Sequence, residues 1–235
     1  MTTDPTSTDG QPLGERGLRT RQRILESVAA CIETQGLRGL RLADMAEEVG
    51  FSPPAFYQYF NDLDEAILAL CEEVGHSIPA FPVPETGWNG APDSAEGTRE
   101  FVARFFEYWD EHRAVLWARN AALIAGDDRF QDVRNETFTP VLDNLRADIA
   151  AAQRDGRVDR SVSARSLGAA LTVMLDRIAM LSPELLERWG TESEDDIVGA
   201  LAYIFDRVLG IPQVGSSSKP VRADRGRPPK KRSRA

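Results

Sequence analysis

Residues 41–60, RLADMAEEVGFSPPAFYQYF, contain two short amphipathic segments with a glycine between them. The apolar residues of the first segment are spaced by three and four positions, which places them on one face of a helix: Leu42, Met45, Ala46 and Val49. Gly50 is expected to end this helix, because glycine readily adopts the left-handed backbone of a helix end. The pattern therefore predicts two helices joined by a tight turn.

The second segment predicts a short helix that is anchored on one side and free on the other. Ser52 suits the cap position, and Pro53 suits the first helical position, where no amide donor is lost. Phe56 and Phe60 lie one turn apart and are expected to anchor the helix to a core. The other side is left with Ser52, Ala55, Tyr57, Gln58 and Tyr59. A short helix held at a steep angle on its partner has the geometry that enters the major groove of DNA.

The neighbouring sequence predicts two further helices that complete a small bundle. Residues 19–35 form the first. Residues 63–74 form the last, and Asn61 or Asp62 is expected to cap it. Over residues 18–74 the chain resembles the N-terminal domain of the TetR family of transcriptional repressors. Three motifs carry the resemblance, in order and without insertions: the opening TRxxIL, the turn AxxxG and the ending YxYF.

The resemblance implies a helix-turn-helix domain that contacts DNA through Arg41, Ser52, Pro53, Ala55, Tyr57, Gln58 and Tyr59. Family members often carry a hydroxyl residue where this chain has Ala55 and a lysine where it has Leu63. Two phosphate anchors are therefore missing, and the salt dependence of binding is expected to be flatter. Tyr57 resembles a phosphate contact of the family, with packing at the bundle edge as the alternative, and for Tyr59 both roles stay open. Gln58 carries the amide that pairs with adenine.

The C-terminal residues carry a charge opposite to that of the chain as a whole. Residues 219–235 hold eight basic residues and one acidic residue, whereas the whole chain has a net charge of −9. Arg225, Gly226, Arg227 and Pro228 resemble the core of an AT-hook, in which glycine permits close approach to the minor groove and arginines enter it. A basic tail without shape preference is the alternative. The acidic body is expected to weaken nonspecific contacts with DNA.

The whole pattern predicts an all-α protein, because no segment shows the alternation of a strand. An N-terminal three-helix helix-turn-helix DNA-binding domain is followed by a larger C-terminal helical domain for ligand binding and dimerisation. The expected organisation is a disordered arm (1–17), the helix-turn-helix domain (18–75), an interdomain loop (76–97), the larger domain (98–210) and a disordered basic tail (211–235).

The larger domain begins with an aromatic-rich helix, and four more helices follow at 113–125, 127–153, 163–181 and 194–209. Pro140 is expected to kink the second of these four. The last two are apolar over more than one stripe, which requires burial on two sides. In the TetR family this pair dimerises across a two-fold axis, which implies an interface of Leu167, Leu171, Ile197, Leu201 and Phe205. A single monomeric core is the alternative. Two DNA-binding domains on a two-fold axis would match a palindromic operator.

The larger domain of the family usually holds a small-molecule pocket. The candidates for its lining are Phe105, Trp109, Trp117, Phe138, Leu142, Met174 and Arg177. Ordinary core packing is the alternative for each aromatic residue, since apolar side chains are normally buried. Aromatic and aliphatic walls favour a small hydrophobic effector, and Arg177 or His112 could meet a carboxylate.

Catalysis, membrane insertion and cofactor binding find no support in the sequence. It contains no nucleophile-elbow, phosphate-loop or zinc-spaced motif, no apolar run long enough to span a membrane and no signal-peptide core. Cys31 and Cys71 lie on apolar stripes and suit a reducing cytosol. We therefore expect a cytoplasmic, ligand-responsive, homodimeric repressor that binds a double-stranded DNA operator. A DNA-binding protein without a small-molecule effector is the alternative.

Overall fold

The computed structural model describes residues 5–37, 40–43, 52–77, 94–188, 190 and 193–211. Most of these residues are helical, and the one β interaction among them is an isolated bridge between Thr6 and Pro12. The all-helical expectation is confirmed. The helices are α1 (Glu15–Gln35), α3 (Pro53–Phe56), α4 (Leu63–Ser77), α5 (Ser94–Glu111), α6 (Arg113–Ala125), α7 (Asp128–Arg154), α8 (Ala164–Arg188) and α9 (Glu194–Leu209).

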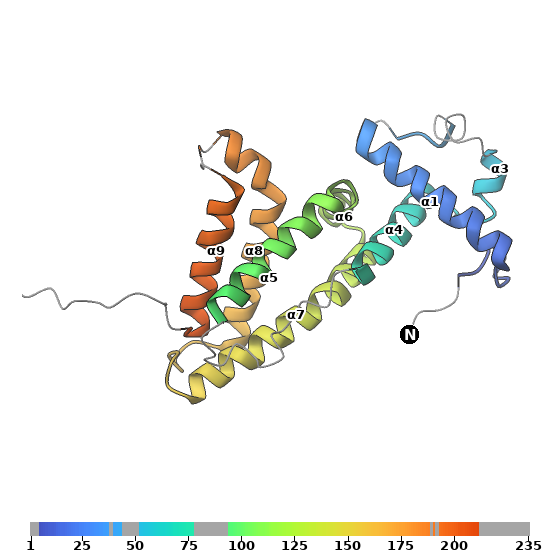
Figure 1. Ribbon diagram of the computed structural model, residues 1–235. Helices are drawn as coiled ribbons and strands as arrows, with labels where there is room; N and C mark the ends of the chain where they lie inside the picture. The colour runs from blue at the N-terminus through green and yellow to red at the C-terminus, as the bar shows by residue number, and fades with distance from the viewer. Residues whose placement is uncertain are drawn as a thin grey trace, which may run out of the picture.

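The helices form two parts that meet at α4 (Figure 1). We call α1, α3 and α4 the head; they gather at one end of the molecule, and α5 to α9 form the larger domain. Besides contacting α1, α4 packs against α6 and α7, and α1 also contacts α6. The long helix α7 packs along α8, while α9 packs against α5. The head therefore rests on α6 and α7, at the opposite end from the α8–α9 pair (Figure 1).

A close approach between α4 and α7 fixes this junction. A β-carbon added at Gly75 of α4 would lie 2.7 Å from Oγ1 of Thr137 on α7, which is too close for any side chain to occupy without movement. The Thr137 hydroxyl is held in place because it donates to the Val133 carbonyl at 2.8 Å. α7 is therefore in direct contact with α4, the helix of the head that packs against the larger domain.

Side-chain caps explain where two helices begin. Asp62 Oδ1 accepts from the Glu65 amide at 2.7 Å, and Glu65 Oε2 accepts from the Asn61 amide at 2.6 Å, a reciprocal cap that starts α4. Asp127 caps α7 by accepting from the Arg129 amide at 3.1 Å. The predicted bounds of α6 and α9 are confirmed at both ends.

The N-terminal residues differ from the expectation of a disordered arm. Residues 5–14 form a turn, and α1 begins at Glu15, one turn earlier than predicted. The Ser7 amide donates to the Gln11 carbonyl at 2.8 Å and closes the turn. Gly10 has a φ of +75°, a backbone conformation that glycine adopts without strain. The hydrogen bond from Ser7 and the backbone of Gly10 therefore give this segment a defined turn.

Helices of the larger domain also extend further than predicted. α5 begins within the segment expected to be a loop, and α8 continues past its expected end to Arg188. Leu185 and Leu186 pack against the core, and their burial outweighs the interruption at Pro183. α7 is likewise continuous through Pro140. Neither proline therefore ends its helix, and the kink expected at Pro140 stays a prediction.

Three predicted segments lie wholly or largely outside the described residues. They are the rest of the first helix of the helix-turn-helix with its turn (44–51), the centre of the interdomain loop (78–93) and the basic tail (212–235).

Candidate functional site

The short helix α3 is anchored in the head by two buried aromatic rings. Phe56 and Phe60 are 0% and 2% exposed, and their ring centroids lie 5.5 Å apart. The Arg21 guanidinium of α1 lies 5.1 Å from the centre of the Phe60 ring and pairs with Glu73 of α4 at 3.3 Å. These contacts hold the segment that contains Phe56 and Phe60 against α1, and both predicted anchors are buried.

The opposite side of α3 and of the turn after it is open to solvent. Of the seven residues predicted to contact DNA, the exposed ones are Arg41, Ser52, Pro53, Tyr57 and Gln58. Tyr57 keeps 52% of its surface exposed. Ala55 and Tyr59 are half-buried, and Tyr59 packs against the core, in line with its packing alternative. Tyr57 and Gln58 are therefore the side chains best placed to reach an outside partner.

Ser52 takes the cap position of α3, but its hydroxyl makes no cap hydrogen bond. A cap side chain normally accepts from the second or third helical amide. Here the second helical residue is Pro54, which has no amide hydrogen, and the amide of Ala55 donates to the Ser52 carbonyl at 2.8 Å. The predicted hydroxyl cap is thus corrected, and Ser52 remains an exposed residue at the start of α3.

The N-terminal turn is bonded to the backbone that carries these exposed residues. Thr8 Oγ1 donates to the Tyr57 carbonyl at 2.9 Å, and the Thr8 amide donates to the Gln58 carbonyl at 3.0 Å. Both acceptors lie just after a helix of one turn, where carbonyls lack helical partners. The sequence did not predict this contact, because the local pattern of neither segment indicates a hydrogen bond between residues so far apart in the chain.

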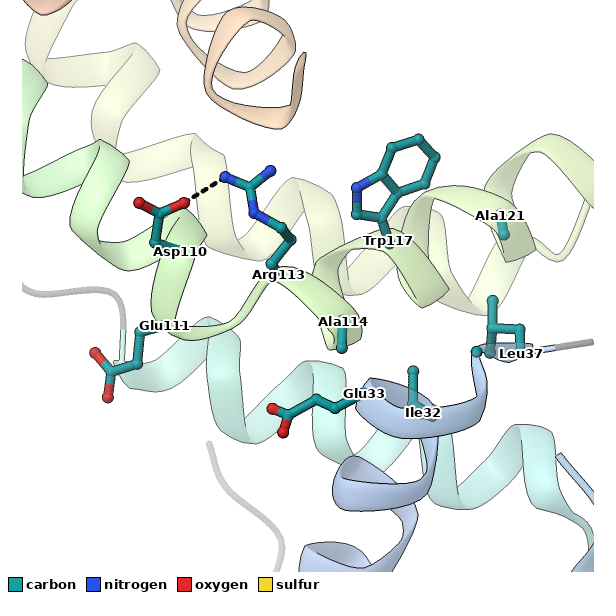
Figure 2. Close-up of a pocket in the computed structure, with 10 residues that line it drawn as sticks. Ile32, Glu33, Leu37, Asp110, Glu111, Arg113, Ala114, Trp117 and Ala121 are labelled. Atoms are coloured by element: carbon teal, nitrogen blue, oxygen red, sulfur yellow. Dashed lines mark hydrogen bonds and ion pairs between the residues drawn. The ribbon is translucent and has the colours of Figure 1, made fainter. Parts of the chain in front are cut away.

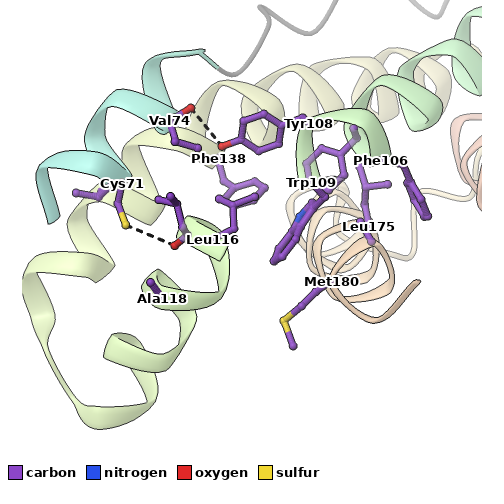
Figure 3. Close-up of a cluster of buried hydrophobic side chains, with 14 of the residues drawn as sticks. Cys71, Val74, Phe106, Tyr108, Trp109, Leu116, Ala118, Phe138, Leu175 and Met180 are labelled. Carbon is purple, nitrogen blue, oxygen red and sulfur yellow. Dashed lines mark hydrogen bonds between the residues drawn. The ribbon is translucent and has the colours of Figure 1, made fainter. Parts of the chain in front are cut away.

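The larger domain buries three of the residues predicted to line an effector pocket. Phe105 and Trp109 are 0% exposed, Phe138 is 7% exposed, and the ring centroids of Phe105 and Phe138 lie 6.2 Å apart. Figure 3 shows Trp109 and Phe138 within one buried cluster that also contains Leu116 of α6. The other four candidates lie further out: Leu142 and Met174 are half-buried, and Trp117 and Arg177 are exposed. The seven residues therefore do not form one lining.

Next to these rings lies a charged cluster inside the core. Arg119 of α6 is 2% exposed, and its Nη2 is 3.7 Å from Oδ1 of Asp176 on α8. The same oxygen accepts from Trp109 Nε1 at 3.2 Å, and Arg134 Nη2 of α7 approaches the other carboxylate oxygen at 3.5 Å. The guanidinium groups of Arg119 and Arg134 lie 5.5 and 5.3 Å from the centre of the Phe138 ring. We call Arg119, Asp176 and Arg134 the buried charge cluster.

Burial changes the acid–base properties of the groups around this cluster. Desolvation lowers the pKa of Arg119, and the Asp176 carboxylate opposes that change. Desolvation raises the pKa of the Tyr108 phenol, whose hydroxyl donates to the Val74 carbonyl at 3.3 Å. It also raises the pKa of the Cys71 thiol to about 12, so this cysteine stays a neutral core residue.

Sequence reasoning missed the buried charge cluster although one signal was present. Arg119 follows Leu116 by three positions and precedes Leu123 by four, so it occupies an apolar stripe of its helix. A basic residue at such a position is either extended to the surface or buried with partners. Only the packing of α6 against its neighbours decides between the two.

Trp117 faces a different space, at the junction with the head. A groove of about 510 Å³ lies between α1 and α6, lined by Ile32, Glu33, Gly36, Leu37, Asp110, Glu111, Arg113, Ala114, Trp117 and Ala121. In Figure 2, Arg113 is paired with Asp110, and Trp117 stands on the α6 side. Trp117 therefore does not belong with the rings around Phe138.

The residues predicted for the dimer interface are mostly buried within the single chain. Leu171, Ile197, Leu201 and Phe205 are at most 7% exposed, and the Phe205 ring lies 5.9 Å from that of Phe101 on α5. Leu167 is half-buried. Phe205 thus faces α5, whereas Ile197 and Leu201 also line a groove between α8 and α9, so the expected interface stays a prediction. The outer side of α8 and α9 carries Val173, Tyr203 and Ile204, which are 55%, 52% and 38% exposed.

Two further findings concern the described part of the chain. None of its helices combines the length and hydropathy that crossing a bilayer requires. Its histidine, cysteine and acidic side chains nowhere gather in threes as a metal site would need.

Comparisons with known proteins agree with this architecture. Residues 82–213 match a family model described as the tetracyclin repressor-like C-terminal domain. The chain is 28% identical over 189 residues to the HTH-type transcriptional regulator EthR of Mycobacterium tuberculosis strain H37Rv, covering 77% of this chain and 86% of that protein. A TetR-family regulatory protein from Rhodococcus RHA1 has a similar fold, with a TM-score of 0.62 at 15% identity over 83% of this chain and 99% of that one.

A third relative is the regulator FadR from Bacillus subtilis, solved in complex with stearoyl-CoA. Its fold matches with a TM-score of 0.59 at 13% identity, over 81% of this chain and 99% of that one. The family model alone spans more than half of the sequence. The family is non-enzymatic. An exposed α3 in a three-helix head, a larger all-helical domain and the match to the family model lead to one assignment: the chain belongs to the TetR family of transcriptional regulators.

Proposed function

We propose that this chain is a repressor that binds a palindromic operator as a homodimer and is released by a small hydrophobic effector. The geometry of α3 carries the proposal. Phe56 and Phe60 are buried in the head, which holds Tyr57 and Gln58 on the solvent side. Side chains presented from a rigid anchor reach a base edge or a phosphate at a small cost in backbone entropy.

In this assignment the two exposed residues have different tasks. The Gln58 amide reads a base edge, with adenine as its natural partner in the major groove. The Tyr57 hydroxyl bonds a phosphate and positions the head without reading sequence. Ser52 and Arg41 are exposed and add polar contacts, whereas the half-buried Ala55 has no hydroxyl to offer.

The larger domain supplies the proposed response to an effector. Phe105, Trp109 and Phe138 are buried in the core, and such an apolar region would suit a ligand with an apolar body. FadR, a protein of the same fold, holds stearoyl-CoA, which supports a hydrophobic ligand for this chain as well. An effector that prefers a conformer with differently spaced heads shifts the population away from the DNA-bound form, with a coupling of about 1–3 kcal/mol.

A second copy of this chain is proposed to cover the outer side of α8 and α9. Val173, Tyr203 and Ile204 are exposed there, beside a groove of about 250 Å³ that is walled by Ile178, Leu185, Ile197, Ala200, Leu201 and Ile204. Exposed apolar side chains around a groove are typical of the core of a homodimer interface. Two heads related by a two-fold axis then face two half-sites.

The test begins with selection of bound sequences from random DNA by the full-length chain. Operator affinity is then measured for Gln58→Ala and Tyr57→Phe. We expect Gln58→Ala to lower affinity about tenfold and to relax the preference at one base pair, since one good base contact is worth about 1–3 kcal/mol. Tyr57→Phe removes a single phosphate contact and should cost about fivefold on all sequences equally.

Asn144→Ala is the control for the loss of an exposed amide, because Asn144 is exposed on α7, outside both the head and the α8–α9 surface. It should leave operator affinity unchanged. If Gln58→Ala and Tyr57→Phe both kept the affinity and base preference of the wild type, the proposal would be wrong.

The basic tail joins the same experiment as a proposed minor-groove contact. A chain that lacks residues 219–235 should lose more affinity for operators with A·T flanks than for operators with G·C flanks, because Arg225 and Arg227 would enter a narrow groove. Equal losses would leave a generic basic tail.

A further inference from the structure

Arg119 is a buried cation whose hydrogen-bonding groups are not all used. Its side chain is 2% exposed, and within the described residues its Nε and Nη2 have no hydrogen-bond partner. The 3.7 Å between Nη2 and Asp176 is an ion-pair distance and is too long for a hydrogen bond. Buried polar groups in proteins are normally paired, so these two donors require an explanation.

The charges around Arg119 do not balance. Asp176 is the single carboxylate in the buried charge cluster, and it is shared with Arg134 at 3.5 Å and with the indole of Trp109 at 3.2 Å. Two guanidinium groups therefore share one carboxylate. Arg134 keeps 27% of its side chain exposed to solvent, so the enclosed Arg119 carries the positive charge that is left incompletely balanced. An apolar side chain at position 119 would avoid that cost, since buried ion pairs seldom stabilise more than well-packed hydrophobic residues.

We infer that Arg119 binds the carboxylate of the effector, so that the ligand is an amphipathic organic acid and not a neutral apolar molecule. This inference rests on the proposed effector control of DNA binding. A carboxylate supplies a negative charge and two planar acceptor oxygens, which match the fork of N–H donors on a guanidinium. It balances the excess charge and pairs the two free donors at once.

The surroundings of Arg119 suit the rest of such a ligand. The Phe138 ring lies 5.5 Å from the guanidinium, and the Phe105 ring packs against Phe138 in the same buried region. Met180, close to Trp109 in Figure 3, is buried, and its sulfur lies 3.3 Å from Asn120 Nδ2. A thioether side chain changes rotamer easily, so Met180 is the wall that moves to admit a ligand body.

The position of Arg119 also connects the ligand to the head. Arg119 lies on α6, and α6 contacts both α1 and α4. The Cys71 thiol of α4 donates to the Val115 carbonyl of α6 at 3.8 Å. A carboxylate that draws Arg119 away from Asp176 displaces α6, and the displacement reaches the two long helices of the head.

The experiment compares acids with their neutral amides on the full-length chain. Decanoic acid is paired with decanamide, and 2-naphthoic acid with 2-naphthamide, so that each pair differs only in charge at the head group. Binding is measured by calorimetry and release by loss of operator affinity. We expect at least one acid to bind ten or more times more tightly than its amide and to release the operator.

Variants then locate the preference at Arg119. Arg119→Met keeps the length of the side chain without the charge and should bring the acid and its amide to within twofold of each other. Arg165→Met is the matched control on an exposed arginine of α8 and should keep the preference. Asp176→Asn removes the internal competitor and should tighten acid binding severalfold. If Arg119→Met does not fold, the wild-type preference and the Asp176→Asn result still decide the matter.

The possible outcomes separate this inference from the function on which it rests. Amides that bind as well as acids, or an acid preference that survives Arg119→Met, would overturn the carboxylate assignment. The same holds if neither acid binds. Release of the operator by neutral compounds alone would also overturn it while leaving effector-controlled repression intact. If neither these compounds nor the metabolites extracted from cells alter operator binding, effector control itself fails.

Discussion

The head and the larger domain place their polar and apolar residues in opposite ways. In the head, Tyr57 and Gln58 are outside and their apolar anchors are inside. In the larger domain, Ile204 is an exposed apolar residue, while Arg119 and Asp176 carry charges in the core.

The difference follows from what each region is proposed to recognise. Duplex DNA is a polyanion that offers polar groups in its grooves, so a reader needs polar side chains on a firm surface. A small effector has to be enclosed, so the groups that orient it lie in a dry core. A second copy of the chain covers apolar surface from outside. Exposure alone therefore misidentifies functional residues in one region or the other.

The largest expected effect tests the apolar outer side of the larger domain. Ile204 is 38% exposed and lines the groove between α8 and α9. We expect Ile204→Asp to weaken dimerisation by roughly 3–5 kcal/mol, because an unpaired carboxylate would be buried by the second copy. Mass determined by light scattering over a concentration series should fall to that of a monomer, and operator affinity should fall with it.

Ile124→Asp is the matched control for this prediction. Ile124 is 86% exposed on α6, away from the α8–α9 groove, so the same chemical change should leave the dimer intact. A dimeric Ile204→Asp variant would show that the two copies meet elsewhere.

A smaller effect is expected from the backbone support of the head. Thr8→Val removes the hydroxyl that donates to the Tyr57 carbonyl at 2.9 Å while it keeps the shape of the side chain. We expect operator affinity to fall about fivefold, in line with roughly 1 kcal/mol for one hydrogen bond, because the turn that presents Tyr57 and Gln58 becomes less ordered. Binding titrations with the selected operator measure the change.

Thr34→Val is the control, since the Thr34 hydroxyl donates to the Ala30 carbonyl at 2.9 Å within α1 and has no contact with α3. Its operator affinity should match that of the wild type. Equal affinities for Thr8→Val and Thr34→Val would mean that the N-terminal turn does not position the DNA-reading residues.

The smallest expected effect distinguishes Arg119, a buried charge proposed to bind the ligand, from Asp148, a charge expected only to lower stability. Burial raises the pKa of Asp148 on α7 to about 6, and its Oδ2 has no hydrogen-bond partner in the described part of the chain. Folding raises the pKa of this carboxyl from about 3.8 to about 6. As the pH rises between these two values the folded state loses stability, because the unfolded chain ionises the carboxyl while the folded chain keeps it protonated. We expect Asp148→Asn to stabilise the chain by about 1 kcal/mol at pH 8, after allowance for solvent screening, and by about half as much at pH 5.

Chemical denaturation at the two pH values measures this difference. Asp143→Asn on the same helix is the control, because Asp143 is exposed, and it should change stability little. The acid-over-amide preference should survive Asp148→Asn. Loss of that preference would show that ligand selectivity comes from the general charge of the core and not from Arg119.

The head was largely predictable because its signals are local. Phe56 and Phe60 are one turn apart, Pro53 marks a helix start and Asp62 caps α4, and each of these signals acts over a few residues. The exception, the absent cap by Ser52, also has a local cause in the missing amide of Pro54. The contact from Thr8 was not predictable, because it joins segments that are distant along the chain.

The site in the larger domain was predictable only in part. Phe105, Trp109 and Phe138 were candidates for the lining of the pocket that the family resemblance implies, and all three are buried. Trp117 is just as aromatic and points to the junction with the head, and Arg177 is exposed while Arg119 is buried. Periodicity shows that a residue lies on a helical face, but it does not show which neighbour covers that face.

The sequence by itself determined that the chain is helical, where α6 and α9 begin and end, and that Tyr57 and Gln58 would be exposed beside buried Phe56 and Phe60. These outcomes depend on backbone propensity, capping and the spacing of apolar residues along a few turns. Only the tertiary structure decided which stripe of α8 and α9 faces outward, which arginine is buried, and that Thr8 supports α3. Those outcomes depend on the crossing of helices that are far apart in the sequence, and burial and charge pairing are properties of such contacts, not of any single segment.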